Sequence, residues 1–314
     1  MRIGLVVDSA CDLPKDFFDK AQVEILPITV RIGDAVQADH RDEAQTLAFL
    51  ESHIAERGAS AETVPYTPEQ IRDLFLERLV GDYDYVFCMT ITGSRSPIFS
   101  NAQKASYMIL NDYKQPRAAA GNTTPFALRV IDTQNLFCAQ GILPVEAARL
   151  RDAGEQPLRI RTRLEELAQN TYGYLVPRDL YYIRNRARAK GDRSISMLSA
   201  ALGTALDIKP VLRGYRGETG PVAKIKGFDP AVEKMFDFAA RRVQSGGLMT
   251  PTVTLCYGGH LDEMRALPGY ERLRNACADQ NVDVFESVMS TTGMVNVGRG
   301  AVVVGFAAKE HAFD

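Results

Sequence analysis

Hydroxyl side chains are concentrated in one short segment of the sequence, TITGSRSPIFSNA, residues 90–102. The segment follows the apolar run YVFCM and precedes a stretch with helical periodicity. It contains five hydroxyls and one cation: Thr90, Thr92, Ser94, Ser96, Ser100 and Arg95. Unpaired N–H groups at a helix start favour a carboxylate or phosphate, and hydroxyls add neutral donors. The segment therefore indicates an anion site, unless Ser96 serves only as a helix cap.

A second polar loop, VVDSACD, follows the first expected strand and contains Asp8 and Asp12. A carboxylate at this position could act in phosphoryl or acyl transfer. In the nucleophile loop of aspartyl-phosphate enzymes, however, the second acid follows the first by two residues, and here it follows by four. The plainer alternative is that Asp12 caps the first helix.

Motifs for cofactors, metals and nucleophilic catalysis are missing from the sequence. The first strand is not followed by G-x-G-x-x-G, and neither G-x-x-x-x-G-K-S/T nor G-x-S-x-G occurs. The four histidines form no local metal pattern, and the five cysteines contain no C-x-x-C pair. The sequence thus predicts no catalytic residue, no cofactor and no metal.

Composition excludes some classes of partner. The formal net charge is -2 and the pI is about 6.2, so no broad attraction to nucleic acid or to an anionic membrane is expected. No apolar stretch approaches the ~18 residues of a membrane span, and the N-terminus reaches an Asp too early for a signal peptide. We expect a cytoplasmic protein.

The elements that must position the two polar loops alternate between strand and helix. Strands are expected at 2–7, 23–33, 83–91 and 128–133, and helices after Asp8 and at 43–58, 67–81, 96–114 and 141–154. Thr67, Pro68 and Gln70 form a capping box, and Pro27 indicates an edge or a bend. Apolar strands alternating with helices predict a parallel sheet covered on both faces.

The second half of the chain has mixed strand directions. Helices are expected at 158–171, 179–190, 194–206, 229–247 and 261–281, and strands at 172–178, 250–259, 282–290 and 299–308, with a hairpin at 208–227. A chain of 314 residues exceeds the usual size of one hydrophobic core. We therefore predict two α/β domains, residues 1–155 with the parallel sheet and residues 156–314 with a mixed sheet.

Several segments, in order along the whole chain, resemble the DegV family of fatty-acid-binding proteins. The family's D-S-x-x-D-L pattern matches Asp8 to Leu13, and its hydroxyl-rich loops align with TVPYTP and TGSRSPIFSNA. Its I-K-P hairpin matches Lys209, Pro210 and Gly217, and NVGRGAVVVGF lies where the family has H-x-G-P-G-A.

The resemblance implies a DegV-like fold with an acyl chain in a tunnel of the C-terminal domain and its carboxylate near the domain interface. Thr63 and Ser96 match the hydroxyls that would hold the carboxylate, and Arg188 matches an arginine whose two preceding glycines are replaced here. Asn296 replaces the usual histidine, so it can donate a hydrogen bond but cannot carry charge.

The resemblance favours a monomeric carrier that presents a long-chain fatty acid to a partner fatty acid kinase. The tail would supply most of the affinity, since each CH₂ removed from water is worth about 0.8 kcal/mol. Two alternatives stay open: a transfer enzyme that uses Asp8 or Asp12, and a regulatory protein whose ligand site is altered at Asn296 and near Arg188.

Overall fold

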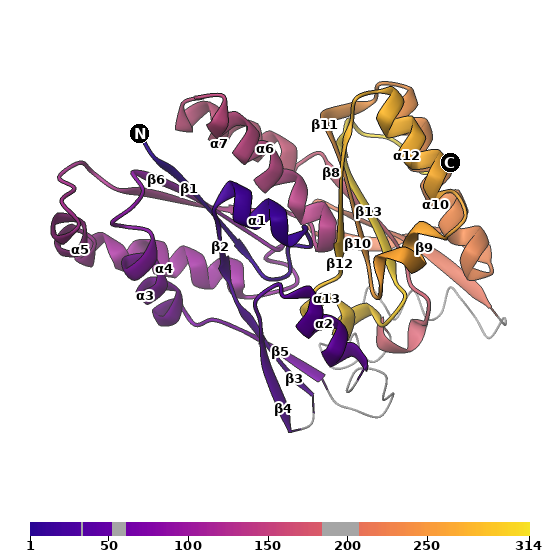
Figure 1. Ribbon diagram of the computed structural model, residues 1–314, viewed down its shortest axis with the longest axis horizontal. Coiled ribbons are helices and arrows are strands. Elements are labelled where there is room, and N and C mark those ends of the chain that lie inside the picture. Colours follow the sequence, from indigo (N-terminus) through magenta and orange to yellow (C-terminus); the bar gives the residue numbers. More distant parts are fainter. Residues whose placement is uncertain (33, 52–60, 184–206) are drawn as a thin grey trace.

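The computed structural model describes residues 1–32, 34–51, 61–183 and 207–314 (Figure 1). A parallel sheet built from the N-terminal half lies beside a mixed sheet built from the C-terminal half, and a smaller antiparallel sheet lies below the junction in this view. The predicted α/β class, with a parallel N-terminal and a mixed C-terminal sheet, is confirmed.

The parallel sheet has the strand order β2-β1-β6-β7. Its strands are β1 (Ile3–Asp8), β2 (Val23–Leu26), β6 (Tyr85–Thr90) and β7 (Ala127–Asp132). All six residues of β1 are buried, which explains the continuous apolar sequence. Leu5 and Val7 face one core cluster and Val6 faces the other, so helices cover both faces as predicted.

The helices on this sheet form two layers (Figure 1). On one face lie α1 (Lys15–Ala21), α6 (Ile142–Asp152) and α7 (Pro157–Ala168); on the other lie α3 (Pro68–Arg78) and α4 (Ile98–Asp112). The short helix α5 (Lys114–Ala119) follows α4, and the 3₁₀ helix η2 (Phe137–Gly141) leads into α6. The predicted capping box at Thr67 is present, with both of its reciprocal hydrogen bonds.

Pro27 divides the expected strand 23–33 into two elements. β2 ends before it as the edge of the parallel sheet, and β3 (Ile28–Ile32) leaves to pair antiparallel with β4 (Ala35–Asp39) and β5 (Ala61–Pro65). The sequence analysis missed β4 and β5. Both strands are only five residues long, and β5 alternates between partly buried and exposed residues and ends at a proline, so neither shows a clear strand pattern.

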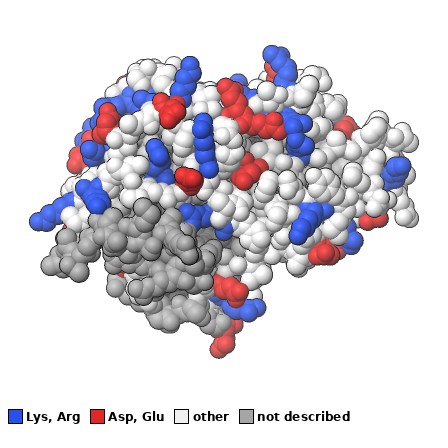
Figure 2. Space-filling view, turned by 180° about the vertical axis from the view of Figure 1, so that it is seen from behind, with Lys and Arg blue, Asp and Glu red and all other residues white. Residues whose placement is uncertain are grey.

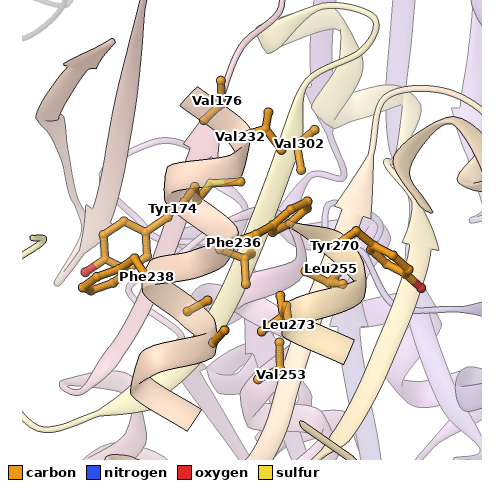
Figure 3. Close-up of a cluster of buried hydrophobic side chains, with 14 of the residues drawn as sticks. Tyr174, Val176, Val232, Phe236, Phe238, Val253, Leu255, Tyr270, Leu273 and Val302 are labelled. Atoms are coloured by element: carbon orange, nitrogen blue, oxygen red, sulfur yellow. The ribbon is translucent and has the colours of Figure 1, made fainter. Parts of the chain in front are cut away.

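The mixed sheet has the strand order β10-β9-β8-β13-β11-β12. Its strands are β8 (Thr171–Val176), β9 (Ile208–Tyr215), β10 (Glu218–Lys226), β11 (Leu248–Tyr257), β12 (Asp283–Val288) and β13 (Val302–Ala308). The predicted hairpin is β9 and β10. One face packs against α10 (Phe228–Gln244) and α12 (Tyr270–Asp279), where Tyr174, Phe236 and Leu273 belong to one apolar cluster (Figure 3).

Alternation along β8 sends neighbouring side chains to opposite faces of this sheet. Tyr174 belongs to the cluster under α10, whereas Leu175 belongs to a cluster that includes Leu212, Val303 and Phe137 of η2. The mixed sheet therefore turns its second face toward segments from the N-terminal half.

Several helices differ from those expected from the sequence. The helix expected at 261–281 is two helices, α11 (Leu261–Arg265) and α12, because Pro268 interrupts the helical pattern and Gly269 has a φ of 87°. The helix α13 (Thr291–Val297) was not predicted. Of the helix expected at 43–58, the described part is α2 (Glu43–Phe49) with residues 50–51, and most of the helices expected at 179–190 and 194–206 lies outside the described residues.

The predicted domain boundary near residue 155 lies between α6 and α7 and remains a prediction. Residues of α7, among them Ile160 and Leu164, belong to the same apolar cluster as Leu5 of the first sheet.

Figure 2 shows positive and negative side chains intermixed over the described part of one face. All five cysteines are buried and unpaired. Within the described ranges, no helix combines the length and apolar character needed to cross a membrane.

Candidate functional site

A cavity of about 400 Å³ lies between the second face of the mixed sheet and loops of the N-terminal half. This volume falls within the range of small-molecule sites, roughly 300–1,000 Å³. Much of the wall is apolar, including Leu175 of β8, Leu212 of β9 and Val303 of β13. Polar groups from the loop after β6, from β5 and from α13 complete the wall.

The loop after β6 is anchored to both halves of the molecule. The backbone N–H of Thr92 donates to the Asn135 carbonyl at 3.0 Å, and the Ser94 hydroxyl donates to the Gly217 carbonyl in the β9–β10 turn at 2.6 Å. The Thr92 and Ser94 hydroxyls also lie 3.1 Å apart, within hydrogen-bonding distance. These two hydroxyls therefore fix the loop, and neither residue lines the cavity.

Ser96 is the hydroxyl of this loop that lines the cavity. Its Oγ accepts a hydrogen bond from the backbone N–H of Ile98 at 3.3 Å, as a capping residue does. The helix α4 nevertheless begins at Ile98, with Pro97 at its N-cap position, so Ser96 lies one residue before the cap. A hydroxyl that accepts in this way keeps its own proton, so Ser96 can also donate to a ligand.

Two other predicted site residues line the same cavity. Thr63 lies in the middle of β5, opposite Val30 of β3, and alternation places Thr63 and Pro65 on the side that lines the cavity. Asn296 lies on α13 and donates one amide proton to the Thr292 carbonyl at 2.7 Å. The amide of Asn296 has a second proton and a carbonyl oxygen with which to bind a ligand.

The structure thus brings Thr63, Ser96 and Asn296 together at one cavity, although they are far apart in the sequence. The fourth predicted residue, Arg188, lies outside the described residues.

Arg95 is a wall residue that the sequence analysis did not select. It is half-buried beside Ser96, and it is the single charged residue among the described residues that line the cavity. No carboxylate belongs to that part of the wall. A positive charge on the wall of a cavity favours an anionic or strongly polar ligand. Its position within the hydroxyl-rich loop was the signal that could have identified it.

Asn135 joins the N-terminal loops to the mixed sheet at the cavity wall. It is 1% exposed, and its amide donates to the carbonyls of Thr171 at 2.9 Å and Gly214 at 3.2 Å. Its Oδ1 accepts from the N–H of Leu136. A Cβ at Gly173 or Gly214 would lie 2.9 or 3.1 Å from this oxygen, so both glycines are required for the close approach. No motif in the sequence marked Asn135.

The carboxylate of Asp8 is fully buried and does not line the cavity. It accepts from the N–H groups of Ala10 at 3.0 Å and Ile91 at 2.6 Å, and both of these residues do line the cavity. Burial raises the pKa of Asp8 to about 6, although these two backbone hydrogen bonds and the Gln140 amide act to lower the pKa. Asp8 therefore fixes the backbone of two wall residues without lining the cavity itself.

Asp12 is also fully buried, and the alternative that it caps the first helix is wrong. The helix α1 begins at Lys15, with Pro14 at its N-cap position. Asp12 instead accepts from the N–H of Ser290 at 2.8 Å and pairs with Arg41 at 3.3 Å. Burial raises the pKa of Asp12, while Arg41 lowers it. Neither Asp12 nor Asp8 lies on the described wall, so this geometry does not favour either as a nucleophile.

The described residues contain no group of three or more His, Cys, Asp or Glu side chains that could hold a metal ion. The polar side chains on the described part of the wall are hydroxyls, amides and one guanidinium, all of which can form hydrogen bonds with a polar ligand.

Comparison with known proteins gives consistent matches over the whole length of the chain. The family model described as "Uncharacterised protein, DegV family" matches residues 2–309. A DegV domain-containing protein of Xanthomonas axonopodis pv. citri is 65% identical over 314 residues, which is 100% of both chains.

Solved structures with the same fold include a stearic acid-binding protein from Eubacterium ventriosum. Its TM-score is 0.77 at 20% identity, with 98% of each chain covered. The DegV fatty acid binding protein of Bacillus subtilis has a TM-score of 0.75 at 19% identity, covering 98% of this chain and 100% of that one. Both likenesses establish the fold.

Proposed function

This chain belongs to the DegV family, and on that premise we propose that it binds a long-chain fatty acid in the cavity between its two halves. The observation that carries the proposal is the composition of the cavity wall. Its described part combines a mostly apolar surface with one cation, Arg95, and with the polar side chains of Thr63, Ser96 and Asn296. An amphiphile with an anionic head group has the matching chemistry. Solved DegV proteins include ones described as binding fatty acids.

We assign the carboxylate to the polar part of the wall and the tail to the apolar part. Ser96 donates its free proton to the carboxylate, Asn296 donates its second amide proton, and Arg95 contributes a positive charge on the same wall. The tail extends along Leu175, Leu212 and Val303. Each buried CH₂ contributes about 0.8 kcal/mol, so the tail supplies most of the affinity and the head group sets the orientation.

The proposal includes a carrier role. A protein that encloses the tail and holds the carboxylate near the junction of its two halves can present that carboxylate to a second protein. By the family resemblance, the partner is a kinase that forms an acyl phosphate. A monomeric state and a cytoplasmic location remain predictions of the sequence.

Native mass spectrometry of the purified protein, followed by denaturing extraction of bound lipid, tests the proposal. We expect one adduct per chain with the mass of a fatty acid, and a rise in melting temperature when fatty acid is added to stripped protein. Purified protein that carries no adduct, and whose melting temperature does not change when fatty acid is added, would refute the proposal and favour the regulatory alternative.

Ser96→Ala tests the head-group assignment, with Ser100→Ala as its matched control. Both serines lie at the start of α4, but the Ser100 hydroxyl donates to the Pro97 carbonyl and does not line the cavity. We expect Ser96→Ala to weaken fatty acid binding by about tenfold, corresponding to the loss of one hydrogen bond to a charged group, and Ser100→Ala to bind like the wild type. Equal affinities for the two variants would place the carboxylate elsewhere.

A further inference from the structure

A buried polar cluster lies behind the cavity wall at the junction of the two halves. It consists of Asp12, Arg41 and Asp39, all from the N-terminal half and all 3% exposed or less. Arg41 pairs with Asp12 at 3.3 Å, and the N–H of Arg41 donates to the Asp39 carboxylate at 3.1 Å. None of the three lines the cavity, and the proposed function does not use them.

All three residues bind the short segment that begins α13. Asp12 accepts from the N–H of Ser290 at 2.8 Å, and the Arg41 guanidinium donates to the Val288 carbonyl at 2.9 Å. One oxygen of Asp39 accepts from both the N–H and the hydroxyl of Thr292, each at 3.1 Å. Residues 288–292 are thus held by three charged groups from a part of the chain about 250 residues earlier. Figure 1 shows α13 beside α2, and the Thr291 and Thr46 hydroxyls of these helices lie 3.4 Å apart.

The anchored segment leads directly to the ligand site. Thr292 lines the cavity, and its carbonyl accepts the amide proton of Asn296, one turn further along α13. The position of the Asn296 side chain therefore depends on the position of Thr292, and the position of Thr292 depends on Asp39. A helix of seven residues has little stability of its own, so tertiary contacts must set its place.

Stability alone explains this cluster poorly. Two of its buried atoms, Asp12 Oδ2 and Arg41 Nε, have no hydrogen-bond partner among the described residues. A buried ion pair is weak support for a fold, and unsatisfied polar atoms make it costly. The cluster is therefore destabilised by unsatisfied polar atoms, yet it fixes one wall of a ligand site. This combination is expected where buried polar residues serve to position a binding residue.

We propose that Asp39, with Arg41 and Asp12, is a positioning residue of the ligand site: it fixes the first turn of α13 and thereby places Asn296 for the head group. The proposal rests on the proposed function, because it assigns to these residues a part in binding the same ligand.

A double-mutant cycle with Asp39→Asn and Asn296→Ala tests the proposal, using hexadecanoic acid as the ligand and chemical unfolding to confirm that each variant is folded. Asparagine has one acceptor oxygen, so it cannot serve both Arg41 and Thr292. We expect Asp39→Asn to weaken binding about tenfold in the wild-type background, but about twofold or less in the Asn296→Ala background. A purely structural role would produce the same factor in both backgrounds.

Arg117→Met is the control for lost stability. Arg117 is 2% exposed and donates to the carbonyls of Val80 and Tyr83 and to Asp84, away from the cavity. We expect it to destabilise the protein while leaving the dissociation constant of the folded protein within about twofold of the wild-type value.

Hydrogen exchange of the wild-type protein serves if Asp39→Asn does not fold. We expect added hexadecanoic acid to slow exchange at the amides of Ser290 and Thr292 more than at amides near Arg117. Unchanged exchange at these two amides in a protein that binds the acid would overturn this inference, as would equal factors in the cycle. A wild-type protein that binds no fatty acid would instead refute the proposed function, and this inference with it.

Discussion

Asp8→Asn should change the pH dependence of stability in a defined direction. The pKa of Asp8 rises from its ordinary value of 3.8 to about 6 in the folded protein, because the carboxylate is fully buried. A group whose pKa is higher in the folded state binds protons more tightly when folded. Its stabilising contribution is therefore complete below about pH 3.8 and is lost as the pH rises through about 6.

The size of the effect follows from the two pKa values. One pKa unit corresponds to about 1.4 kcal/mol, so the full difference amounts to about 3 kcal/mol, of which about 1.4 kcal/mol develops between pH 7 and pH 5. Asparagine does not titrate and retains most of the shape. The free energy of unfolding of the wild type, minus that of Asp8→Asn, should thus increase by about 1.4 kcal/mol as the pH falls from 7 to 5.

Urea unfolding at several pH values measures this difference. The absolute stability of Asp8→Asn is not diagnostic, since the variant removes a buried charge but also one acceptor for the Ala10 and Ile91 N–H groups. Asp16→Asn, which removes an exposed carboxylate, is the control. Parallel profiles for the wild type and Asp8→Asn would show that Asp8 ionises normally and would refute the reasoning.

Two further predictions concern the cavity wall. Arg95→Gln should weaken binding of a fatty acid by about tenfold while leaving binding of the fatty alcohol of equal length almost unchanged, because only the acid is charged. Calorimetric titration with both ligands measures this difference. Equal losses of affinity for the acid and the alcohol would exclude a role of Arg95 in charge recognition. Asn135→Ala should lower the free energy of unfolding by about 2–4 kcal/mol, since the buried carbonyls of Thr171 and Gly214 lose their hydrogen-bond donor. Urea unfolding measures this loss. A loss below about 0.5 kcal/mol would show that water or a shift of the loop supplies new donors to these carbonyls.

Local sequence patterns determined much of the N-terminal architecture. The apolar run in β1 predicted a strand buried on both faces, and Thr67 with Pro68 and Gln70 predicted the start of α3. The turn between β9 and β10 was visible as a Gly-rich interruption of two alternating strands. These features depend on residues that are neighbours in the chain, so their signals lie within short windows.

The sequence pattern was least informative where an element depends on distant contacts. The strand β5 has no buried run, and α13 is too short to show helical periodicity. Both elements exist because other parts of the fold hold them: β3 pairs with β5, and Asp39 and Asp12 hold the start of α13. Propensity is a weak guide when tertiary contacts supply most of the stability of an element.

By itself, the sequence determined the α/β class, the hydroxyl-rich helix start and, through the family resemblance, the choice of Thr63, Ser96 and Asn296. Only the tertiary structure decided that these three side chains line one cavity, and that Arg95 and Asn135 join them there. It also decided that Asp12 binds Ser290, 278 residues away, and not the helix that follows it in the chain. The physical reason is that burial and long-range hydrogen bonds assign a polar side chain its role, and neither is encoded in the spacing of nearby residues.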